Sequence, residues 1–380
     1  MPYFSFSIHD NNALLNEFNI KPNQVYFSKS TYIWRILNKE KYKNICTLNR
    51  EKRKKISKIG KSILFCLPPS IGLGDAIEYA HALRAIKKSN IFKNIGIAFT
   101  EKCSFIFNEY FELSDLYPFF ISKEIINKYE TLFHFTLEIE ALKIQKYIRS
   151  NIENEIKSFF KIISDPFIIK SKKYTKIKKI SIFPISNSPI RTMPFDILEK
   201  LLNFFKQNFI VEAYFDKNSE ISNYLLEKIN QNNISIIDCR GKKELVNSIQ
   251  NIEYGVFMDS GPLHIAKLFN KKGVLIESSV SSKTLLNKNK NIISINNKYS
   301  SPYCKSPCGL TDLFNYNGKC GCYENLKIVY TDSKIKNLFE YYSMRGVKNN
   351  YITHIENPVG CLRSLDVQNI LNYIKKDLRL

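Results

Sequence analysis

The segment Asp259-Ser260-Gly261-Pro262-Leu263-His264 carries the residue types in this chain best suited to binding a diphosphate. It follows an apolar run over 254–258 and opens a predicted helix over 262–269. A helix N-terminus offers unpaired backbone N–H groups and the positive end of the helix dipole, which together favour an anion. Pro262 suits the first helical turn, and the His264 ring can hydrogen-bond a phosphate or a sugar. An ordinary surface histidine is the alternative interpretation.

A second group that can hold a phosphate is Arg191, in the loop Arg191-Thr192-Met193-Pro194. This loop follows a predicted strand over 180–183. An arginine on such a loop can bind a phosphate through two parallel hydrogen bonds. Because any loop can carry an arginine, Arg191 indicates a phosphate site only in combination with the segment Asp259–His264.

The turn Gly72-Leu73-Gly74-Asp75 brings a carboxylate to the start of a predicted helix over 76–88. Gly72 and Gly74 allow a tight turn and the close approach of a ligand. A dinucleotide-binding fingerprint would need a third glycine at position 77, which is Ile77. Asp75 can accept a proton from a reacting group; the alternative is that it only caps its helix.

Strands and helices alternate along the chain, which predicts an α/β fold with parallel sheets. We expect strands over 63–67, 95–99, 180–183, 209–214, 234–237, 254–258 and 274–276. We expect helices over 76–88, 194–205, 219–231, 243–250, 262–269 and 364–376. With 380 residues, the chain exceeds the roughly 250–300 residues at which one core stops growing.

Two doubly wound, Rossmann-like domains are therefore predicted, at 61–175 and 176–360. An N-terminal extension over 1–60, with a short helix near 32–38, precedes them. A C-terminal helix over 361–380 follows them, and a basic linker over 171–179 separates the two halves. Ligands of such sheets bind outside the carboxyl ends of the strands. We therefore expect the site in a cleft where the turn at 72–75 faces the segment 259–264.

The chain is strongly basic, with 57 Lys and Arg against 35 Asp and Glu. Three explanations compete: a coding bias that enriches Lys, Asn and Ile, contact with an anionic membrane surface, and nucleic-acid binding. The basic residues are dispersed and no nucleic-acid motif is recognised, which argues against the third explanation. The densest basic run, 50–61, is either a solvated linker or a patch for lipid headgroups, at about 1 kcal/mol for each basic residue.

Localisation follows from two further patterns. No stretch reaches about 18 uninterrupted apolar residues, so no membrane-spanning helix is expected. The first residues do not show the basic and apolar regions of a signal peptide. We expect a cytoplasmic protein, with peripheral contact at the inner face of the membrane as an extension of that expectation.

Five of the nine cysteines crowd the C-terminal quarter, four of them in a loop over 303–323. Clustered cysteines in a cytosolic protein suggest metal before disulfide. Two interpretations stay open: a structural zinc or iron site, and a set of reduced structural thiols. The five residues are Cys304, Cys308, Cys320, Cys322 and Cys361.

Over about residues 60–375 the sequence resembles the heptosyltransferases of lipopolysaccharide synthesis, glycosyltransferase family 9. The resemblance is carried by four segments. These are Gly74-Asp75 leading into an Ala- and Leu-rich helix, the loop 191–194, the segment 259–264 with the following helix and strand to 276, and Cys361-Leu362 before the last helix.

The resemblance implies a GT-B fold and inverting transfer without a catalytic metal or other cofactor, from a nucleotide-diphosphate sugar to a glycan, glycolipid or protein. The absence of an Asp-x-Asp motif agrees with this. The first domain would hold the acceptor and the second the sugar nucleotide. Some relatives that modify proteins carry a cysteine-bound iron. Met193 stands where the family has Trp, and Arg191 where it has Lys, which leaves the identity of donor and acceptor open.

The resemblance also implies roles for individual residues. Asp75 is similar to the family's candidate base, beside the acceptor-side turn of Gly72 and Gly74. The implied donor-binding residues are Arg191, Glu220, Asp259, Ser260, Gly261 and His264, with Ser260, Gly261 and His264 at the diphosphate and Glu220 at the ribose. Two other functions compete with the transferase: a nucleotide-sugar epimerase, and a basic nucleic-acid-binding or scaffold protein on a catalytically inactive GT-B fold.

Overall fold

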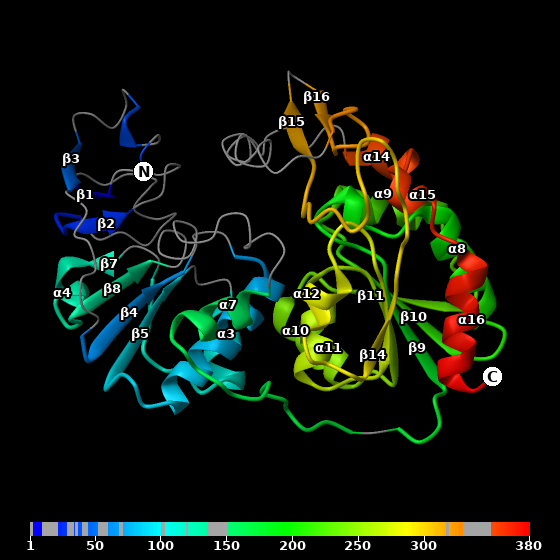
Figure 1. Ribbon diagram of the computed structural model, residues 1–380, viewed down its shortest axis with the longest axis horizontal. Helices are drawn as coiled ribbons and strands as arrows, with labels where there is room; N and C mark the ends of the chain where they lie inside the picture. Colours follow the sequence, from blue (N-terminus) through cyan, green and yellow to red (C-terminus); the bar gives the residue numbers. More distant parts are fainter. Residues whose placement is uncertain are drawn as a thin grey trace. The chain divides into compact units, whose positions relative to one another are not determined.

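The structure, a computed structural model, describes residues 3–9, 22–28, 34, 37–39, 45–51, 60–67, 71–99, 103–118, 121–134, 151–172, 174–316, 319–329 and 351–380. The chain divides into two compact units (Figure 1). The first contains Met1–Gly72, Tyr79–Lys143 and Glu153–Ser164. The second contains Leu73–Glu78, Ile144–Ile152 and Asp165–Leu380.

The first unit contains a four-stranded sheet whose strands are all parallel, in the order β6-β5-β4-β8. Helix α3 (Leu73–Lys88) connects β4 to β5, because neighbouring parallel strands need a crossover connection. The strand and helix predicted around residues 72–75 are present, but the helix begins at Leu73 rather than Ala76. The predicted turn is therefore wrong for Leu73, Gly74 and Asp75, which form the first helical turn, where an acidic residue suits the helix dipole. The strands are β4 (Ser62–Cys66), β5 (Asn94–Phe99), β6 (Leu116–Pro118) and β8 (Thr131–His134).

A second, antiparallel sheet in the first unit has the order β3-β1-β2-β7. Its strands are β1 (Tyr3–Ile8), β2 (Tyr26–Ser28), β3 (Cys46–Glu51) and β7 (Ile121–Ser122). For residues 1–60 we expected only a short helix near 32–38, most of which lies outside the described residues, as does most of the basic run 50–61. The remaining elements of this unit are η3 (Ile106–Tyr110), α4 (Lys123–Ile126) and α7 (Ile152–Phe159).

The second unit is built on six parallel strands in the order β11-β10-β9-β12-β13-β14. From β9 the chain runs outward through β10 to β11, and then returns to the other side of β9 with β12. The strand order therefore reverses between β9 and β12. The strands are β9 (Lys179–Phe183), β10 (Ile210–Phe215), β11 (Ile234–Asp238), β12 (Tyr254–Phe257), β13 (Gly273–Ile276) and β14 (Ile292–Ile295).

Helices cover both faces of this sheet. Figure 1 shows α8 (Phe195–Phe205) and α16 (Val367–Leu378) on one face, and α10 (Lys242–Gln250), α11 (Gly261–Leu268) and α12 (Ser282–Leu286) on the other. Other elements are α9 (Glu220–Lys228), the hairpin of β15 (Phe314–Tyr316) and β16 (Lys319–Gly321), α14 (Tyr351–Glu356) and α15 (Gly360–Arg363).

The core of the second unit explains why its central strands could be predicted from apolar runs in the sequence. The central strands are buried on both faces, as their continuous apolar runs indicated. The side chains of Ile180, Ile182 and Val256 pack with those of α8 and α16 in one cluster. The predicted α/β class with parallel sheets in both halves is confirmed. In the part of the chain that the structure describes, no helix is long and apolar enough to cross a membrane.

Candidate functional site

The segments that follow β9 and β12 meet at the point where the strand order of the second unit reverses. Phe183 in β9 pairs with Phe257 in β12, so the carboxyl ends of the two strands lie side by side. Arg191 follows the first strand and Asp259 the second. In open α/β sheets this reversal is the usual place for a ligand.

Arg191 is held in place by its own loop. It ends a short 3-10 turn, Pro189–Arg191. The buried hydroxyl of Thr192 donates to the carbonyl oxygen of Ser188 at 3.0 Å and accepts from the N–H of Ser186 at 3.1 Å. These bonds close the loop and direct the arginine toward β12.

The guanidinium of Arg191 contacts Asp259 twice. Nη1 lies 3.3 Å from Oδ2 and 3.2 Å from the backbone carbonyl oxygen of Asp259. The buried Nε has no hydrogen-bond partner among the described residues. Because a guanidinium has five N–H donors, Arg191 keeps donors for a further anion beyond those that bind Asp259.

The N-terminus of α11 has no side-chain cap. Ser260 is the N-cap residue, with an extended backbone, but its hydroxyl does not cap the helix. The hydroxyl oxygen lies 3.4 Å from the carbonyl oxygen of Met258 instead. Within the described residues the backbone N–H groups of Ser260 and Gly261 make no hydrogen bond. Two donors therefore remain at the positive end of the helix, where a phosphate would bind.

The first turn of α3 lies against α11 within the second unit. A Cβ atom added to Gly74 would stand 2.7 Å from Cδ2 and 3.1 Å from Nε2 of His264. A Cβ atom on Gly261 would stand 3.3 Å from Cβ of Leu73. Asp75, the residue after Gly74, is exposed in the first turn of α3. The structure thus places the helix start that bears Asp75 beside the histidine of the segment Asp259–His264.

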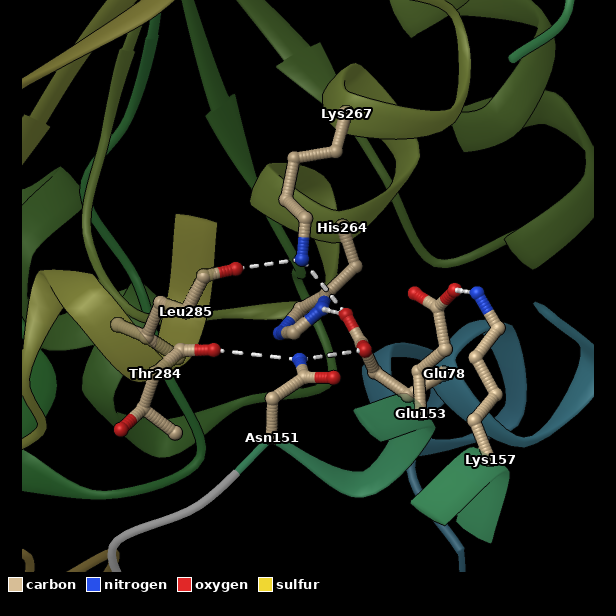
Figure 2. Close-up of polar contacts among 8 residues, drawn as sticks. All are labelled: Glu78, Asn151, Glu153, Lys157, His264, Lys267, Thr284 and Leu285. Carbon is tan, nitrogen blue, oxygen red and sulfur yellow. Dashed lines mark hydrogen bonds and ion pairs between the residues drawn. The ribbon is translucent and has the colours of Figure 1, made fainter. Parts of the chain in front are cut away.

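Three polar residues near His264 were missed by the sequence analysis (Figure 2). The buried carboxylate of Glu78 accepts hydrogen bonds from Nδ1 of His264 at 2.8 Å, Nζ of Lys267 at 2.6 Å and Nδ2 of Asn151 at 2.7 Å. Asn151 also donates to the carbonyl oxygen of Thr284, and Lys267 to that of Leu285. One signal was available in the sequence: Glu78 is a charged residue between the apolar residues Ile77 and Tyr79, one turn after Asp75.

Two predicted site residues lie apart from these contacts. Glu220 is the exposed first residue of α9, after β10, and no contact joins it to Arg191, Asp259 or His264 among the described residues. Since β10 neighbours β9, Glu220 still follows a strand end at the same edge of the sheet. Gly72 precedes α3 and is grouped with the first unit.

Four of the five clustered cysteines line one small cavity, together with Ile190, Ser279 and Glu324. Burial raises the pKa of Cys304 to about 11 and that of Cys308 to about 12. Burial also raises the pKa of Cys322 and Cys361. In the described part of the chain, however, no three Cys, His, Asp or Glu residues are close enough to hold a metal ion. The cysteines that line the cavity are Cys304, Cys308, Cys322 and Cys361, whereas Cys320 does not line it.

No protein-family model and no curated protein matches this chain. Among solved structures, it is similar to the iron-containing glycosyltransferase TibC of enterotoxigenic E. coli, with 10% identity and a TM-score of 0.48 over 99% of this chain and 92% of that one. It is also similar to E. coli ADP-heptose lipopolysaccharide heptosyltransferase II, with 12% identity and a TM-score of 0.45 over 62% and 90%. A family 9 glycosyltransferase of Veillonella parvula gives 11% identity and a TM-score of 0.46 over 62% and 85%. At these TM-scores the likeness assigns no role to any residue.

Proposed function

We propose that this protein is a heptosyltransferase-like glycosyltransferase that moves a sugar from a nucleotide-diphosphate donor to a glycan, glycolipid or protein acceptor. The supporting observation is that Arg191 contacts Asp259, directly before the uncapped N-terminus of α11, at the reversal of the strand order. This arrangement gathers a guanidinium and backbone N–H donors at one point, which suits a diphosphate.

The donor would bind with its diphosphate between Arg191 and the N–H groups of Ser260 and Gly261. Asp259 holds the guanidinium in position through its carboxylate and its carbonyl oxygen. Glu220 follows the neighbouring strand and would accept a hydrogen bond from the ribose, as acidic residues at such strand ends do for nucleotides. Residues 176–360 would form the nucleotide-sugar domain, and 61–175 the acceptor domain.

The reaction would be a single displacement. Asp75 takes the proton of the acceptor hydroxyl while the hydroxyl oxygen attacks the anomeric carbon. The bond from that carbon to the diphosphate oxygen breaks, and the configuration of the carbon inverts. Negative charge grows on the leaving diphosphate, where Arg191 and the helix terminus stabilise it. Gly72, just before α3, and Gly74, packed against His264 in its first turn, would lie on the acceptor side of the site.

The cysteines would have a structural role. Four thiols line one cavity, but among the described residues they are not arranged as ligands of one metal ion. No step of the proposed reaction uses them. The enzyme would act in the cytoplasm on surface-glycan precursors, including those of lipopolysaccharide, and its basic charge would favour contact with anionic lipid at the inner face of the membrane.

A thermal-shift panel of ADP, GDP, UDP and CDP tests the proposed donor site. A ligand that binds only the folded protein at 100 times its Kd adds about 2.7 kcal/mol of stability. We expect one nucleotide to raise Tm in the wild type and to raise it clearly less in Arg191→Ala. Arg363→Ala is the matched control, because this exposed arginine lies at the end of α15, outside the strand ends.

The alternative, a nucleic-acid-binding or scaffold protein, predicts a different pattern. No nucleotide would raise Tm, while DNA or RNA would, and that rise would fall steeply with salt because basic residues release counterions from phosphates. The observation that favours this alternative is the net charge of +22. The nucleotide-sugar epimerase is distinguished by its product, since it would convert the donor without an acceptor.

A further inference from the structure

Glu78 is a buried carboxylate that binds His264, Lys267 and Asn151, and the proposed reaction leaves it without a role. It is 3% exposed and lies on α3, one turn after Asp75. Figure 2 shows that Nδ1 of His264 and Nζ of Lys267 both point to its Oε1 atom, while Asn151 binds its Oε2 atom. All of these residues belong to the second unit.

The contacts determine where the imidazole proton lies. The ammonium of Lys267 at 2.6 Å favours the ionised form of Glu78. An ionised carboxylate only accepts hydrogen bonds, so Nδ1 of His264 at 2.8 Å must carry a proton. In the neutral ring the hydrogen is therefore on Nδ1, and Nε2 is an acceptor.

The acceptor atom lies near Gly74, in the first turn of α3. The ring edge that carries Cδ2 and Nε2 lies against Gly74, where an added Cβ would stand 2.7 Å from Cδ2. Among the residues that the structure describes, Nε2 has no hydrogen-bond partner. A phosphate oxygen has no proton to give to such an atom, whereas a hydroxyl group has one.

We propose that Glu78 is a positioning residue that fixes His264 as the Nδ1–H tautomer, so that Nε2 accepts a hydrogen bond from a hydroxyl of the sugar nucleotide. This proposal rests on the proposed function for the identity of the ligand. It differs from the role implied for His264 by the family resemblance, which was contact with the diphosphate. The hydroxyl belongs either to the ribose or to the transferred sugar.

The tautomer can be measured without a ligand. The protein is labelled with 15N-histidine, and long-range 1H–15N correlation spectra at pH 7 distinguish the two neutral tautomers from imidazolium. The chain has five histidines, and His264→Ala assigns the signal. We expect the Nδ1–H tautomer in the wild type and a mixture of tautomers in Glu78→Gln. An imidazolium or Nε2–H signal from His264 in the wild type overturns the proposal.

A control separates positioning from folding. Glu153 is also a buried glutamate paired with a lysine, Lys157, on the neighbouring turn of α7. Glu153→Gln should leave the His264 tautomer as in the wild type. If Glu78→Gln fails to fold, the wild-type spectrum still decides the question. If Glu153→Gln shifts the tautomer as much as Glu78→Gln does, the specific role of Glu78 is refuted.

Calorimetry identifies the hydroxyl. The probes are the nucleoside diphosphate from the panel that stabilises the protein, its 2′-deoxy form, its glucose conjugate and inorganic diphosphate. A lost hydrogen bond to a hydroxyl should weaken binding about 2- to 15-fold in His264→Ala. If His264→Ala loses affinity for the glucose conjugate alone, the hydroxyl belongs to the sugar. If it loses affinity for the nucleoside diphosphate but not for the 2′-deoxy form, the hydroxyl belongs to the ribose. An equal loss for all probes, inorganic diphosphate included, assigns a phosphate contact and overturns the proposal.

The two proposals can fail separately. If no nucleotide binds, the proposed glycosyltransferase function fails, while the tautomer of His264 is still measured in the free protein. If nucleotides bind but His264 carries its proton on Nε2, the inference about Glu78 fails and the function stands.

Discussion

Nη1 of Arg191 lies 3.3 Å from Oδ2 of Asp259, and the two residues follow adjacent strands that are far apart in the sequence. The pair leaves part of the guanidinium unused, since Nε is buried without a partner in the described structure. We expect Arg191→Ala to weaken nucleoside diphosphate binding about 10- to 100-fold, because a hydrogen bond to a charged group contributes roughly 1.5–3 kcal/mol. Calorimetry measures the change, and Arg191→Lys should restore only part of it. Unchanged affinity in Arg191→Ala would remove this residue from the donor site.

Asp75→Asn should separate catalysis from binding. Asn keeps the size of the side chain and loses the basic carboxylate, which contributes about 10²- to 10⁴-fold to rate when it acts as a general base. The nucleotide should still raise Tm by the wild-type amount. The measurement is release of nucleoside diphosphate from the sugar nucleotide in the presence of acceptor.

Glu227→Gln is a suitable control for Asp75→Asn. Glu227 is an exposed carboxylate on α9 and should tolerate the change with wild-type rate. If the rate of Asp75→Asn falls by less than about tenfold, the loss is smaller than the least expected from removing a general base. Another group then takes the proton.

Gly74→Ala should displace the ring of His264. The new methyl group would stand 2.7 Å from Cδ2, and such overpacking costs about 1–3 kcal/mol of unfolding free energy. Chemical denaturation measures the loss. In the double variant Gly74→Ala/His264→Ala the methyl group has room, so the two losses should be clearly less than additive. Strict additivity would mean that the two residues do not touch in solution.

Local sequence patterns predicted the helix starts at the candidate site but not the contacts between distant segments. The segments 259–264 and 72–75 are each contiguous in sequence, and their helix-start signals predicted a helix beginning at each of them. The pairing of Arg191 with Asp259 depends on the order of strands in the sheet, which local patterns do not specify. The contact of Glu78 with His264 joins two helices that are distant in sequence. It could not be inferred from either helix alone.

The fold shows the same division. Runs such as that of β9 and β12 are buried on both faces and strongly apolar, so they were predicted with nearly correct ends. Strand β14 and the hairpin of β15 and β16 were missed, because Ile292–Ile295 is short and half of it is not buried, and the hairpin lies in the polar cysteine loop. The antiparallel sheet of β1 to β3 needs partners distant in sequence, which the pattern of residues 1–60 does not reveal.

The cysteine cavity predicts loss of stability at high pH if its thiols are free. Burial raises the pKa of Cys304 to about 11 and that of Cys308 to about 12, from a value of 9.0 when exposed. The folded state therefore keeps protons that the unfolded chain releases. This stabilisation is complete below pH 9 and is lost as the pH rises toward 11–12. Thermal melts between pH 7 and 11 should show a smaller alkaline decline in Cys308→Ala than in the wild type.

A structural metal would reverse this dependence. Metal-bound cysteines are thiolates, so stability would be lost as the pH falls and protons compete for sulfur. Protein purified without chelator should then contain about one zinc or iron per chain, detectable by elemental analysis, and Cys322→Ser should lower that content. Cys103→Ser, a buried cysteine of the first unit, should not. Absence of both metals together with the alkaline decline would leave the thiol interpretation alone.

The position of β9 has a consequence for how the protein is made. This strand is the first of its sheet to leave the ribosome, yet its place beside β12 requires Ile180 to meet Tyr254. Pairing with β10 can begin early, but the other edge of β9 stays open until the segment of β12 has been synthesised, at about 5–20 residues per second. Until then the nascent chain exposes an apolar strand edge to its surroundings. Arg191 can acquire its partner Asp259 only when that edge is closed, so the site is assembled late in synthesis.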